Sequence, residues 1–466
     1  MTAATTGAAP ADAAVADTLI VQGGRPLHGE VRVAGFKHAL VTVIGAALVG
    51  RAPIAIRNCP EIEDTRVLAE VLRRAGGRVT HGTGTLDLDL GELRDLPLDP
   101  LLTARIHGTA YLLPGLLARF GRVELPPTGG CRIGDRPAGG RPVEQYLRVL
   151  TRFGAHGEIS ADGTLSVTAD RLTGCELDLR EFMADPVLLS GPLYSGATKT
   201  AILAAAAAQG TTRLHYPYPK PDVTELVRVL SRLGWTITRP GPAELVIEGR
   251  PDRGETRPVE HTLISDLIEV VTWATAAVLT GGSIRLTGLT GAALSTGLAP
   301  EIAVARDLGL YWEPDGADAV VIRPHQPSRP VDVTVASHGI YSDSQPFLML
   351  LATAAPGVSH IRETVWQQRF AHAGELNRLG TRIEVSGAMA RITGDHPPVR
   401  GADRLTATDL RGAAALLLGA LRARGTTRIT GTGHLVRGYR DLVGDLRRLG
   451  ARIETGGPLR EPNDQP

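Results

Sequence analysis

The feature that most constrains the fold of this 466-residue chain is a unit that recurs six times along it. Each unit contains a stretch with Leu and Val at three- and four-residue intervals. This spacing is typical of a helix with one buried face. The six stretches begin at Val67, Gln145, Glu225, Ile302, Glu375 and Asp441.

A glycine follows each of the six stretches, and a strand-like run follows each glycine. Glycine readily adopts the left-handed conformation that ends many helices, so we expect these positions to turn the chain from helix into strand. The six are Gly77, Gly154, Gly234, Gly309, Gly380 and Gly450.

A second kind of helical segment alternates with the first. These segments are rich in alanine and almost entirely apolar, as in AILAAAAAQG from Ala201 and AAALLLGALRARG from Ala413. A helix that is apolar on all sides is a buried one. Each unit is therefore predicted to be a βαβ-type module with one buried and one surface helix.

Six modules divide naturally into two groups of three, and a chain of 466 residues is too long for one ordinary core. We therefore predict an α/β protein of two pseudo-symmetric domains. The alternative is an ordinary doubly wound α/β protein whose helices happen to end in glycine. Six matched pairs of helices favour the repeated architecture.

Bulk properties exclude several classes of function. A net charge of +1 gives no electrostatic basis for binding nucleic acid or a membrane. Three widely spaced cysteines argue against a disulfide framework and a zinc site. Residues 1–17 contain no Lys or Arg and no apolar run, so we expect a disordered extension rather than a signal peptide. We expect a cytoplasmic protein with a short tail at 457–466, no cofactor and no obligate protein partner.

Lysine is scarce in this chain, because only Lys37, Lys199 and Lys220 are lysine among its 50 basic residues. Lys37 lies between a strand-like segment and an apolar helix. A cation beside the free N–H groups of a helix N-terminus suits an anionic oxygen. The alternative is a solvated lysine in a turn.

The segment from Leu125 to Pro142 contains five glycines and four prolines and has no helical or strand period. Long loops of this kind inside a compact domain are usually functional or disordered. The loop carries Cys131, which is followed directly by Arg132 and soon after by Arg136. Neighbouring cations lower the pKa of a thiol, so Cys131 is a candidate proton donor or nucleophile. The alternative is a buried cysteine that acts as a small hydrophobe.

Several other charged residues stand at the entrance to apolar helices, where solubility would not require them. Together they predict a cationic cleft for a phosphate and a carboxylate, because the planar guanidinium matches both groups. These residues are Asp343, Arg369, Asp409, Arg411 and Arg437, and the predicted cleft also includes Lys37, Arg105 and Arg136. The sequence has no phosphate-binding GxxxxGK[ST] loop, no GxGxxG after a strand and no HExxH, so no metal site is predicted.

Four motifs resemble those of the enolpyruvyl transferases: GGCRIGDRP from Gly129, TDLR from Thr408, RGY from Arg437, and the stretch that runs from Arg369 into ELNRLG. The chain is similar to UDP-N-acetylglucosamine 1-carboxyvinyltransferase and, more distantly, to the 5-enolpyruvylshikimate-3-phosphate synthases. The resemblance extends from Leu19 to Glu454.

The resemblance implies a two-domain inside-out α/β barrel with three repeats in each domain. In that topology the first strand joins the C-terminal domain. The implied domains are residues 18–36 with 261–456, and residues 37–260, which carry the Cys131 loop.

The resemblance also implies phosphoenolpyruvate as the donor and assigns roles at its site. The phosphate-binding cations would be Lys37, Arg136 and Arg437. The carboxylate and closure arginines would be Arg369 and Arg411, with Arg105 as a further arginine. Cys131 would be the general acid and the residue that fosfomycin modifies. Asp343 would be the base that faces the acceptor hydroxyl, and Asp409 a second proton-relay carboxylate.

Departures from the family pattern gather on the acceptor side. The family's Lys-Asn pair is Lys37-His38 here, and AGGR is inserted before PVEQY. The hinge segment HTLISDLIE lacks the usual arginine after Asp266. The resemblance places the acceptor against His38, Arg136, Arg141, Tyr194, Ser195, Gly196 and Asp343.

These departures favour a changed acceptor, a uridine nucleotide of the UMP type used in nucleoside-antibiotic biosynthesis. The first alternative is a cell-wall enzyme that uses UDP-N-acetylglucosamine. The second is an inactive nucleotide-binding homologue, which the retained Lys37, Cys131, Asp343, Asp409 and Arg437 argue against.

Overall fold

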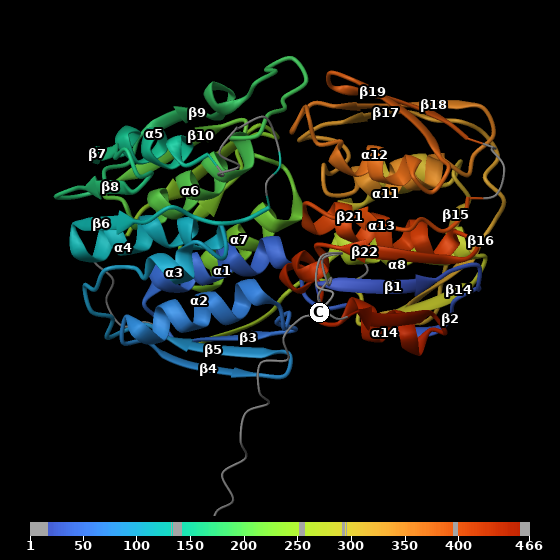
Figure 1. Ribbon diagram of the computed structural model, residues 1–466. Coiled ribbons are helices and arrows are strands. Elements are labelled where there is room, and N and C mark those ends of the chain that lie inside the picture. Colours follow the sequence, from blue (N-terminus) through green and yellow to red (C-terminus); the bar gives the residue numbers. More distant parts are fainter. Residues whose placement is uncertain are drawn as a thin grey trace, which may run out of the picture.

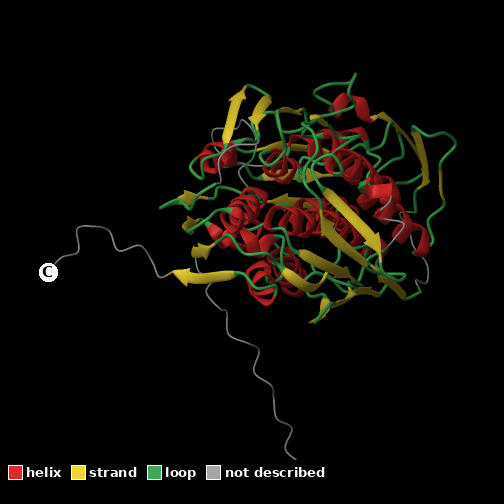
Figure 2. Ribbon diagram, turned by 90° about the vertical axis from the view of Figure 1, so that its right-hand side faces the viewer, coloured by secondary structure: helices red, strands yellow, loops and turns green. Residues whose placement is uncertain are grey.

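The computed structural model describes residues 17–131, 133, 142–250, 257–290, 294, 296–394 and 399–456. The fold is mixed α/β with six small sheets. Figure 1 shows two groups of elements side by side, one built mainly from the N-terminal half and one mainly from the C-terminal half. Strands lie around the periphery and helices lie between them (Figure 2). The expected extension and tail lie outside the described residues, except for Asp17.

Three sheets form from strands that lie between Ile54 and Thr262. One has the order β13 (Val259–Thr262), β3 (Ile54–Arg57), β5 (Thr85–Asp89), β4 (Arg78–Gly82). The next has the order β6 (Arg122–Leu125), β8 (Leu165–Thr168), β7 (His156–Ile159). The third has the order β11 (Ile237–Thr238), β12 (Glu244–Glu248), β10 (Thr211–His215), β9 (Glu176–Asp178).

The other three sheets draw on the second half and on the first two strands. One has the order β15 (Leu310–Pro314), β16 (Val320–Pro324), β14 (Ser283–Thr287), β2 (His28–Arg32). The next has the order β17 (Asp332–Val335), β18 (Val358–Glu363), β20 (Met389–Thr393), β19 (Arg382–Ser386). The last has the order β21 (Leu405–Thr406), β22 (Thr426–Thr430), β1 (Thr18–Gln22), β23 (Arg452–Gly456).

All the four-stranded sheets share one pairing pattern. An edge strand runs parallel to its neighbour, and the remaining pairs are antiparallel, as in β13–β3 followed by β3–β5 and β5–β4. The same order of pairings recurs around β10, β14, β18 and β22. Among the described residues, the sheet of β6, β8 and β7 has no parallel edge strand. The repeated pattern agrees with the repeats in the sequence.

The helices are of the two expected kinds. Predominantly apolar helices with most residues buried are α1 (Lys37–Gly50), α4 (Leu113–Phe120), α6 (Tyr194–Ala207), α8 (Leu267–Thr280), α11 (Gln345–Ala352) and α13 (Leu410–Arg422). Helices with a mixed buried and exposed face are α2 (Glu63–Arg74), α5 (Glu144–Arg152), α7 (Pro221–Arg232), α10 (Ala299–Ala305), α12 (Ala371–Asn377) and α14 (Leu442–Arg448). Short helical turns are α3 (Pro100–Thr103), η1 (Gly108–Leu112), η2 (Leu179–Phe182) and η3 (Thr432–Arg437).

Small residues let the apolar helices approach closely. A Cβ atom on Gly115 of α4 would lie 2.7 Å from Leu48 of α1. Interiors are packed at crystal-like density, so a core of many close helices needs small side chains at such contacts. This explains why an interior of this size is built with only 4% aromatic residues. Within the described ranges, no helix is long and apolar enough to cross a bilayer.

Five of the six predicted helix-ending glycines have positive φ, at Gly154, Gly234, Gly309, Gly380 and Gly450. The prediction for Gly77 was wrong, because Gly76 is the left-handed residue, with φ of 91°. The chain turns one position earlier there. Gly77 is instead needed for close packing, since a Cβ atom on it would lie 2.9 Å from the Leu72 carbonyl oxygen.

The chain crosses between the two groups of elements at two adjacent places. After β2 it reaches Gly35, which forms a bridge with Ser265 just beyond β13. Asp266, which caps α8, also accepts a hydrogen bond from the Lys37 N–H at 3.3 Å, so the N-termini of α1 and α8 meet at the crossing. The expected domain boundary at residues 260–261 falls inside β13. The crossing therefore brings the start of α1 to the region where the two groups meet.

Candidate active site

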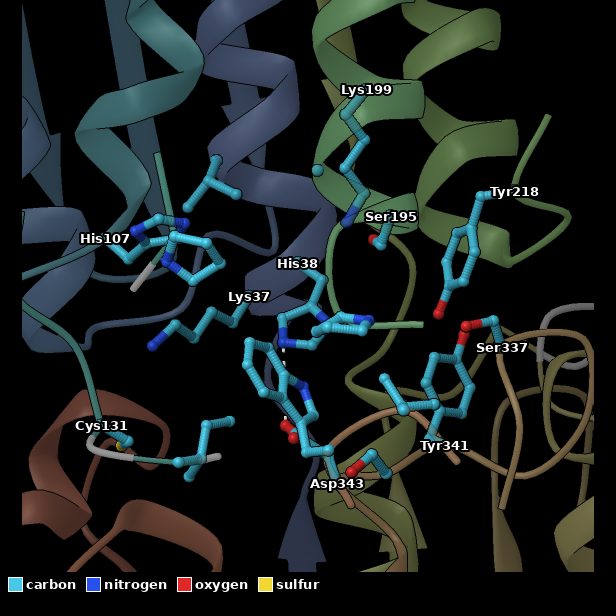
Figure 3. A pocket seen from close by; sticks show the side chains of 18 of the residues that line it. Lys37, His38, His107, Cys131, Ser195, Lys199, Tyr218, Ser337, Tyr341 and Asp343 are labelled. Atoms are coloured by element: carbon cyan, nitrogen blue, oxygen red, sulfur yellow. Dashed lines mark ion pairs between the residues drawn. The ribbon is translucent and has the colours of Figure 1, made fainter. Parts of the chain in front are cut away.

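A cavity of about 200 Å³ is lined by residues from both groups of elements. Its walls come from the start of α1, the loop that carries Cys131, the start of α6, residues 336–343 and the start of α13. Figure 3 shows Lys37 and Cys131 toward one end, His38 and Asp343 in the middle, and Lys199 and Tyr218 toward the other end. The predicted site residues that line it are Lys37, His38, Cys131, Ser195, Gly196, Asp343, Arg369, Arg411 and Arg437.

Two cations converge at the Lys37 end of the cavity. The Lys37 ammonium lies 3.0 Å from Asp64 Oδ1 and donates to the Arg437 carbonyl oxygen at 2.9 Å. The Arg437 guanidinium lies 3.7 Å from the other oxygen of Asp64. Burial lowers the pKa of Lys37, and Asp64 opposes that effect. The Asp64 carboxylate therefore holds the two cations close together.

The sulfur of Cys131 is fixed by two donors. Arg437 Nη1 donates to it at 3.2 Å, and the Leu410 N–H at the start of α13 donates at 3.3 Å. The Cys131 side chain is buried. Its expected neighbours Arg132 and Arg136 lie outside the described residues. The cation that contacts the sulfur comes instead from a segment 306 residues away.

Asp343 lies between two arginines. Its Oδ1 accepts a hydrogen bond from Arg369 at 2.7 Å, and its Oδ2 accepts one from Arg411 Nε at 3.1 Å. Burial alone would raise the pKa of the Asp343 carboxyl, but the two guanidinium groups hold this pKa well below its ordinary value. Asp343 is therefore ionised and neutralised by Arg369 and Arg411.

Asp409 is close to this group but does not line the cavity. It caps α13, because its Oδ1 accepts hydrogen bonds from the backbone N–H groups of Arg411 and Gly412, each at 3.1 Å. The same oxygen lies 3.7 Å from Arg369. These hydrogen bonds hold the backbone of Arg411 at the start of α13. The expected role of Asp409 in proton relay stays a prediction.

On the acceptor side, His38, Ser195 and Gly196 line the cavity. The His38 Nε2 atom lies 3.7 Å from Asp343 Oδ2. Tyr194 does not line the cavity: its side chain is buried, and its hydroxyl donates to the Tyr216 carbonyl oxygen at 2.7 Å. Tyr194 therefore supports the wall behind Ser195, and its assigned contact with the acceptor stays a prediction.

Arg105 also lies apart from the cavity. Its side chain is 52% exposed and is paired with Glu63, whose Oε1 accepts a hydrogen bond from Arg105 Nε at 2.7 Å. The predicted position at the phosphoenolpyruvate site is thus not the one observed. Arg136 and Arg141 lie outside the described residues, so their assigned roles stay predictions.

Sequence reasoning missed two acidic residues that organise the site. Asp64, in the first turn of α2, binds both Lys37 and Arg437. Asp222, in the first turn of α7, forms a buried ion pair with Lys199, which lines the acceptor end. The scarcity of lysine in the sequence could have pointed to these two residues. All three lysines of the chain are buried or nearly so, two of them line this cavity, and each of those two pairs with one of the missed carboxylates.

The cavity thus has two chemically different ends. Lys37, Arg437, Arg369 and Arg411 provide donors suited to phosphate and carboxylate oxygens. The middle carries the His38 imidazole, and the other end carries small polar residues and the Lys199–Asp222 pair, which suit a polar second substrate. Among the residues that the structure describes, no cluster of three or more His, Cys, Asp or Glu is placed to hold a metal ion.

Comparison with known proteins gives a consistent result. The family model for EPSP synthase (3-phosphoshikimate 1-carboxyvinyltransferase) matches residues 21–446. A UDP-N-acetylglucosamine 1-carboxyvinyltransferase of Anaeromyxobacter dehalogenans (strain 2CP-C) is 36% identical over 448 residues, covering 94% of this chain and 99% of that protein. The enzyme of the same name from Sorangium cellulosum (strain So ce56) is 34% identical, covering 93% and 97%.

Solved structures agree. The crystal structure of the enolpyruvyl transferase NikO from Streptomyces tendae matches with a TM-score of 0.88 and 44% identity, covering 94% of this chain and 98% of that one. EPSP synthase from Acinetobacter baumannii matches with a TM-score of 0.70 and 18% identity, covering 94% and 100%, which shows the shared fold. This chain therefore belongs to the EPSP synthase family and is a carboxyvinyl, or enolpyruvyl, transferase.

Proposed function

We propose that this enzyme transfers the enolpyruvyl group of phosphoenolpyruvate to a secondary hydroxyl of a uridine nucleotide, a UMP-type acceptor of nucleoside-antibiotic biosynthesis, and releases phosphate. The observation that carries the proposal is the contrast between the two ends of the cavity. The end with Lys37, Cys131 and Arg437 keeps the residues of the family motifs, whereas the other end has His38 in place of the family's asparagine.

The cations account for donor binding. Lys37 and Arg437 lie within reach of one anionic group, because both already contact Asp64. We assign them, with Arg136, to the phosphate of phosphoenolpyruvate. Arg369 and Arg411 would bind its carboxylate through guanidinium N–H groups other than the ones that donate to Asp343. Fixed cations of this kind stabilise charge that develops on the departing phosphate.

The chemistry then needs an acid and a base at opposite sides of the enol. Protonation of C3 by the Cys131 thiol makes C2 electrophilic, and the acceptor oxygen attacks C2 as it loses its proton. The resulting tetrahedral adduct loses phosphate and one C3 proton, which returns to the sulfur. The family resemblance assigns the basic role to Asp343, with Asp409 as a second carboxylate nearby.

We assign the two groups of elements to two inside-out domains of three repeats each, residues 18–36 with 261–456, and residues 37–260. The pairing of β1 with β22 and β23, and of β2 with β14, supports the first assignment. Closure of such domains over the cavity would exclude water from the reacting centre.

The direct test is a coupled phosphate-release assay with phosphoenolpyruvate and each nucleotide in turn. We expect turnover with UMP and little with UDP-N-acetylglucosamine. The 44% identity with NikO, against 36% with the enzyme named for UDP-N-acetylglucosamine, supports this preference. Turnover with UDP-N-acetylglucosamine but none with UMP would contradict it.

UDP-N-acetylglucosamine is the second candidate acceptor. It is supported by the coverage of the named relatives, which align over 94% of this chain. The same assay separates the two, because the candidates share the uridine and differ in the sugar that bears the reacting hydroxyl.

Substitution of Asp343 tests the catalytic role of this residue, whichever nucleotide is the acceptor. Asp343→Ala is expected to lower kcat by about 10²–10⁴-fold, the range typical of general acid–base catalysis. A loss of kcat of only a few-fold would show that Asp343 has no role in the proton transfer.

A further inference from the structure

The imidazole of His38 is placed where a proton acceptor is needed. His38 is the second residue of α1, and its ring stacks on Phe36 with the ring centroids 5.1 Å apart. Its side chain is 33% exposed and lines the cavity next to Asp343 (Figure 3). The ring is thus held on one face and open to a substrate.

Asp343 by itself is poorly suited to take a proton from a hydroxyl group. Both of its oxygens accept hydrogen bonds from arginines, Oδ1 from Arg369 and Oδ2 from Arg411. Burial would raise the pKa of this carboxyl, yet the guanidinium groups hold it well below its ordinary value. A base is most effective when its pKa lies near the working pH, so a carboxylate stabilised this strongly gains little by accepting a proton.

Among the described residues, no arginine donates to the His38 imidazole in this way. Burial lowers its pKa, the negative charge of Asp343 opposes that effect, and the positive charge of Lys199 adds to it. The ring is therefore neutral at physiological pH and has a lone pair that can accept a proton. Asp343 lies beside Nε2, which favours the tautomer with its proton there and leaves the lone pair on Nδ1. Nothing within the described part of the chain hydrogen-bonds to Nδ1.

We propose that His38 is the general base that takes the proton of the acceptor hydroxyl, and that Asp343 acts through it as a positioning and charge-balancing carboxylate. This inference deepens the proposed transfer to a uridine nucleotide and rests on it. The arrangement resembles the carboxylate–histidine pair of other enzymes. In such a pair the carboxylate orients the ring and stabilises the imidazolium without itself taking the proton.

The proton transfer balances as follows. The acceptor O–H bond breaks, its proton moves to the imidazole, and the oxygen forms a bond to C2 of phosphoenolpyruvate. The C2–C3 double bond takes a proton from the Cys131 thiol at C3. In the second half, the adduct loses a C3 proton to the thiolate, and the imidazolium proton leaves on the phosphate as HPO₄²⁻. His38 and Cys131 both end as they began.

The family motif supplies a matched variant. Asparagine stands at this position in the resembled enzymes, so His38→Asn introduces a side chain that the fold accepts but that cannot take up a proton. We expect kcat with phosphoenolpyruvate and UMP to fall about 10²–10⁴-fold, with KM for UMP changed much less. A residue that only binds the acceptor would instead raise KM.

The pH profile gives a readout that a binding role would not move. Besides Asp343 and Lys199, the charged groups that act on His38 are Asp222 and Asp266. In the wild type, kcat/KM should fall on the acid side as His38 becomes protonated, and His38→Asn should remove that limb. A variant that keeps kcat within a few-fold of the wild type, with the acid limb intact, overturns the proposal.

A double-variant cycle tests the partnership with Asp343. If the two residues act as one unit, His38→Asn combined with Asp343→Asn should cost about as much as the more damaging single change. Losses that multiply would show independent roles and overturn the pairing. If the wild type uses UDP-N-acetylglucosamine rather than UMP, the proposed acceptor fails, and the same series with that nucleotide still decides the role of His38.

Discussion

The guanidinium of Arg437 donates a hydrogen bond to the sulfur of Cys131 at 3.2 Å, although the two residues are 306 positions apart in the chain. The second donor to the sulfur, the Leu410 N–H, also comes from the C-terminal part. The thiol of one group of elements is therefore held by donors of the other group. This contact makes the environment of the cysteine depend on how the two groups are placed.

Covalent modification of Cys131 should depend on this contact. We expect fosfomycin to add once to the wild-type protein and not to Cys131→Ala, as seen by intact mass. Arg437→Met should slow the addition about tenfold or more, because a charge-assisted hydrogen bond contributes roughly 1.5–3 kcal/mol. An unchanged mass of the wild type after incubation would contradict the assignment of the reactive thiol.

Asp64 should control the alkaline limit of activity. Burial lowers the pKa of Lys37, and Asp64 is the main group that raises it again. In Asp64→Asn the pKa of Lys37 should fall further, so Lys37 loses its charge at a lower pH. We expect the alkaline limb of kcat/KM for phosphoenolpyruvate to move to lower pH.

The matched control lies on the same helix. Glu70→Gln removes a carboxylate of α2 that pairs with Arg74 at the surface, away from the cavity. It should leave the profile unchanged. An alkaline limb that stays in place in Asp64→Asn would show that Lys37 does not need this partner.

Local patterns in the sequence predict much of this fold. Helix periodicity and the glycines that follow it identify both helices of each module, because one buried face and a left-handed turn are local requirements. Gly76 and Gly77 show the limit of this reasoning. Two adjacent glycines satisfy the same pattern, and only the packing against Leu72 decides which of them turns the chain.

The direction of a side chain at the site depends on partners that are distant in the sequence, and local sequence patterns do not predict these partners. Arg105, in the turn after α3, does not line the cavity and pairs instead with Glu63 at the start of α2. Successive residues of a helix point about 100° apart, so Tyr194 and Ser195 at the start of α6 face different sides. The motif that contains them identifies the segment and not the residue that meets the substrate.

Arg411 should contribute strongly to stability through Asp343. The side chain is fully buried, contacts the Asp343 carboxylate at 3.1 Å and lies over the ring of Tyr439. Removing one partner of a buried ion pair leaves an uncompensated charge and typically costs about 3–5 kcal/mol. We expect Arg411→Met to lower the thermal midpoint clearly.

The partner variant shows whether the ion pair is the cause. Combining Arg411→Met with Asp343→Asn should recover part of the loss, because the negative charge that then has only Arg369 as a partner is removed. A double variant as unstable as the sum of the single ones would instead assign the effect to lost packing against Tyr439.

The crossing between the two groups contains a carboxyl whose titration should appear in the pH dependence of stability. Glu269 accepts hydrogen bonds from the Ala34 N–H at 3.1 Å and from Trp273 Nε1 at 3.2 Å. Burial raises its pKa from 4.5 to about 8, and nearby Asp266 adds to this. The folded state therefore holds a proton that the unfolded state has released between these two pH values.

The sign of the effect follows from this difference. Below pH 4.5 both states are protonated, and as the pH rises toward 8 only the folded state keeps the proton, so the free energy of unfolding falls. The slope for one proton is at most about 1.4 kcal/mol per pH unit. Glu269→Gln has no proton to lose, so its thermal midpoint should rise relative to the wild type between pH 5 and 8. Glu30→Gln, at an exposed pair with Arg285, should show no such trend. Parallel curves for Glu269→Gln and the wild type would mean that Glu269 is already ionised at the crossing.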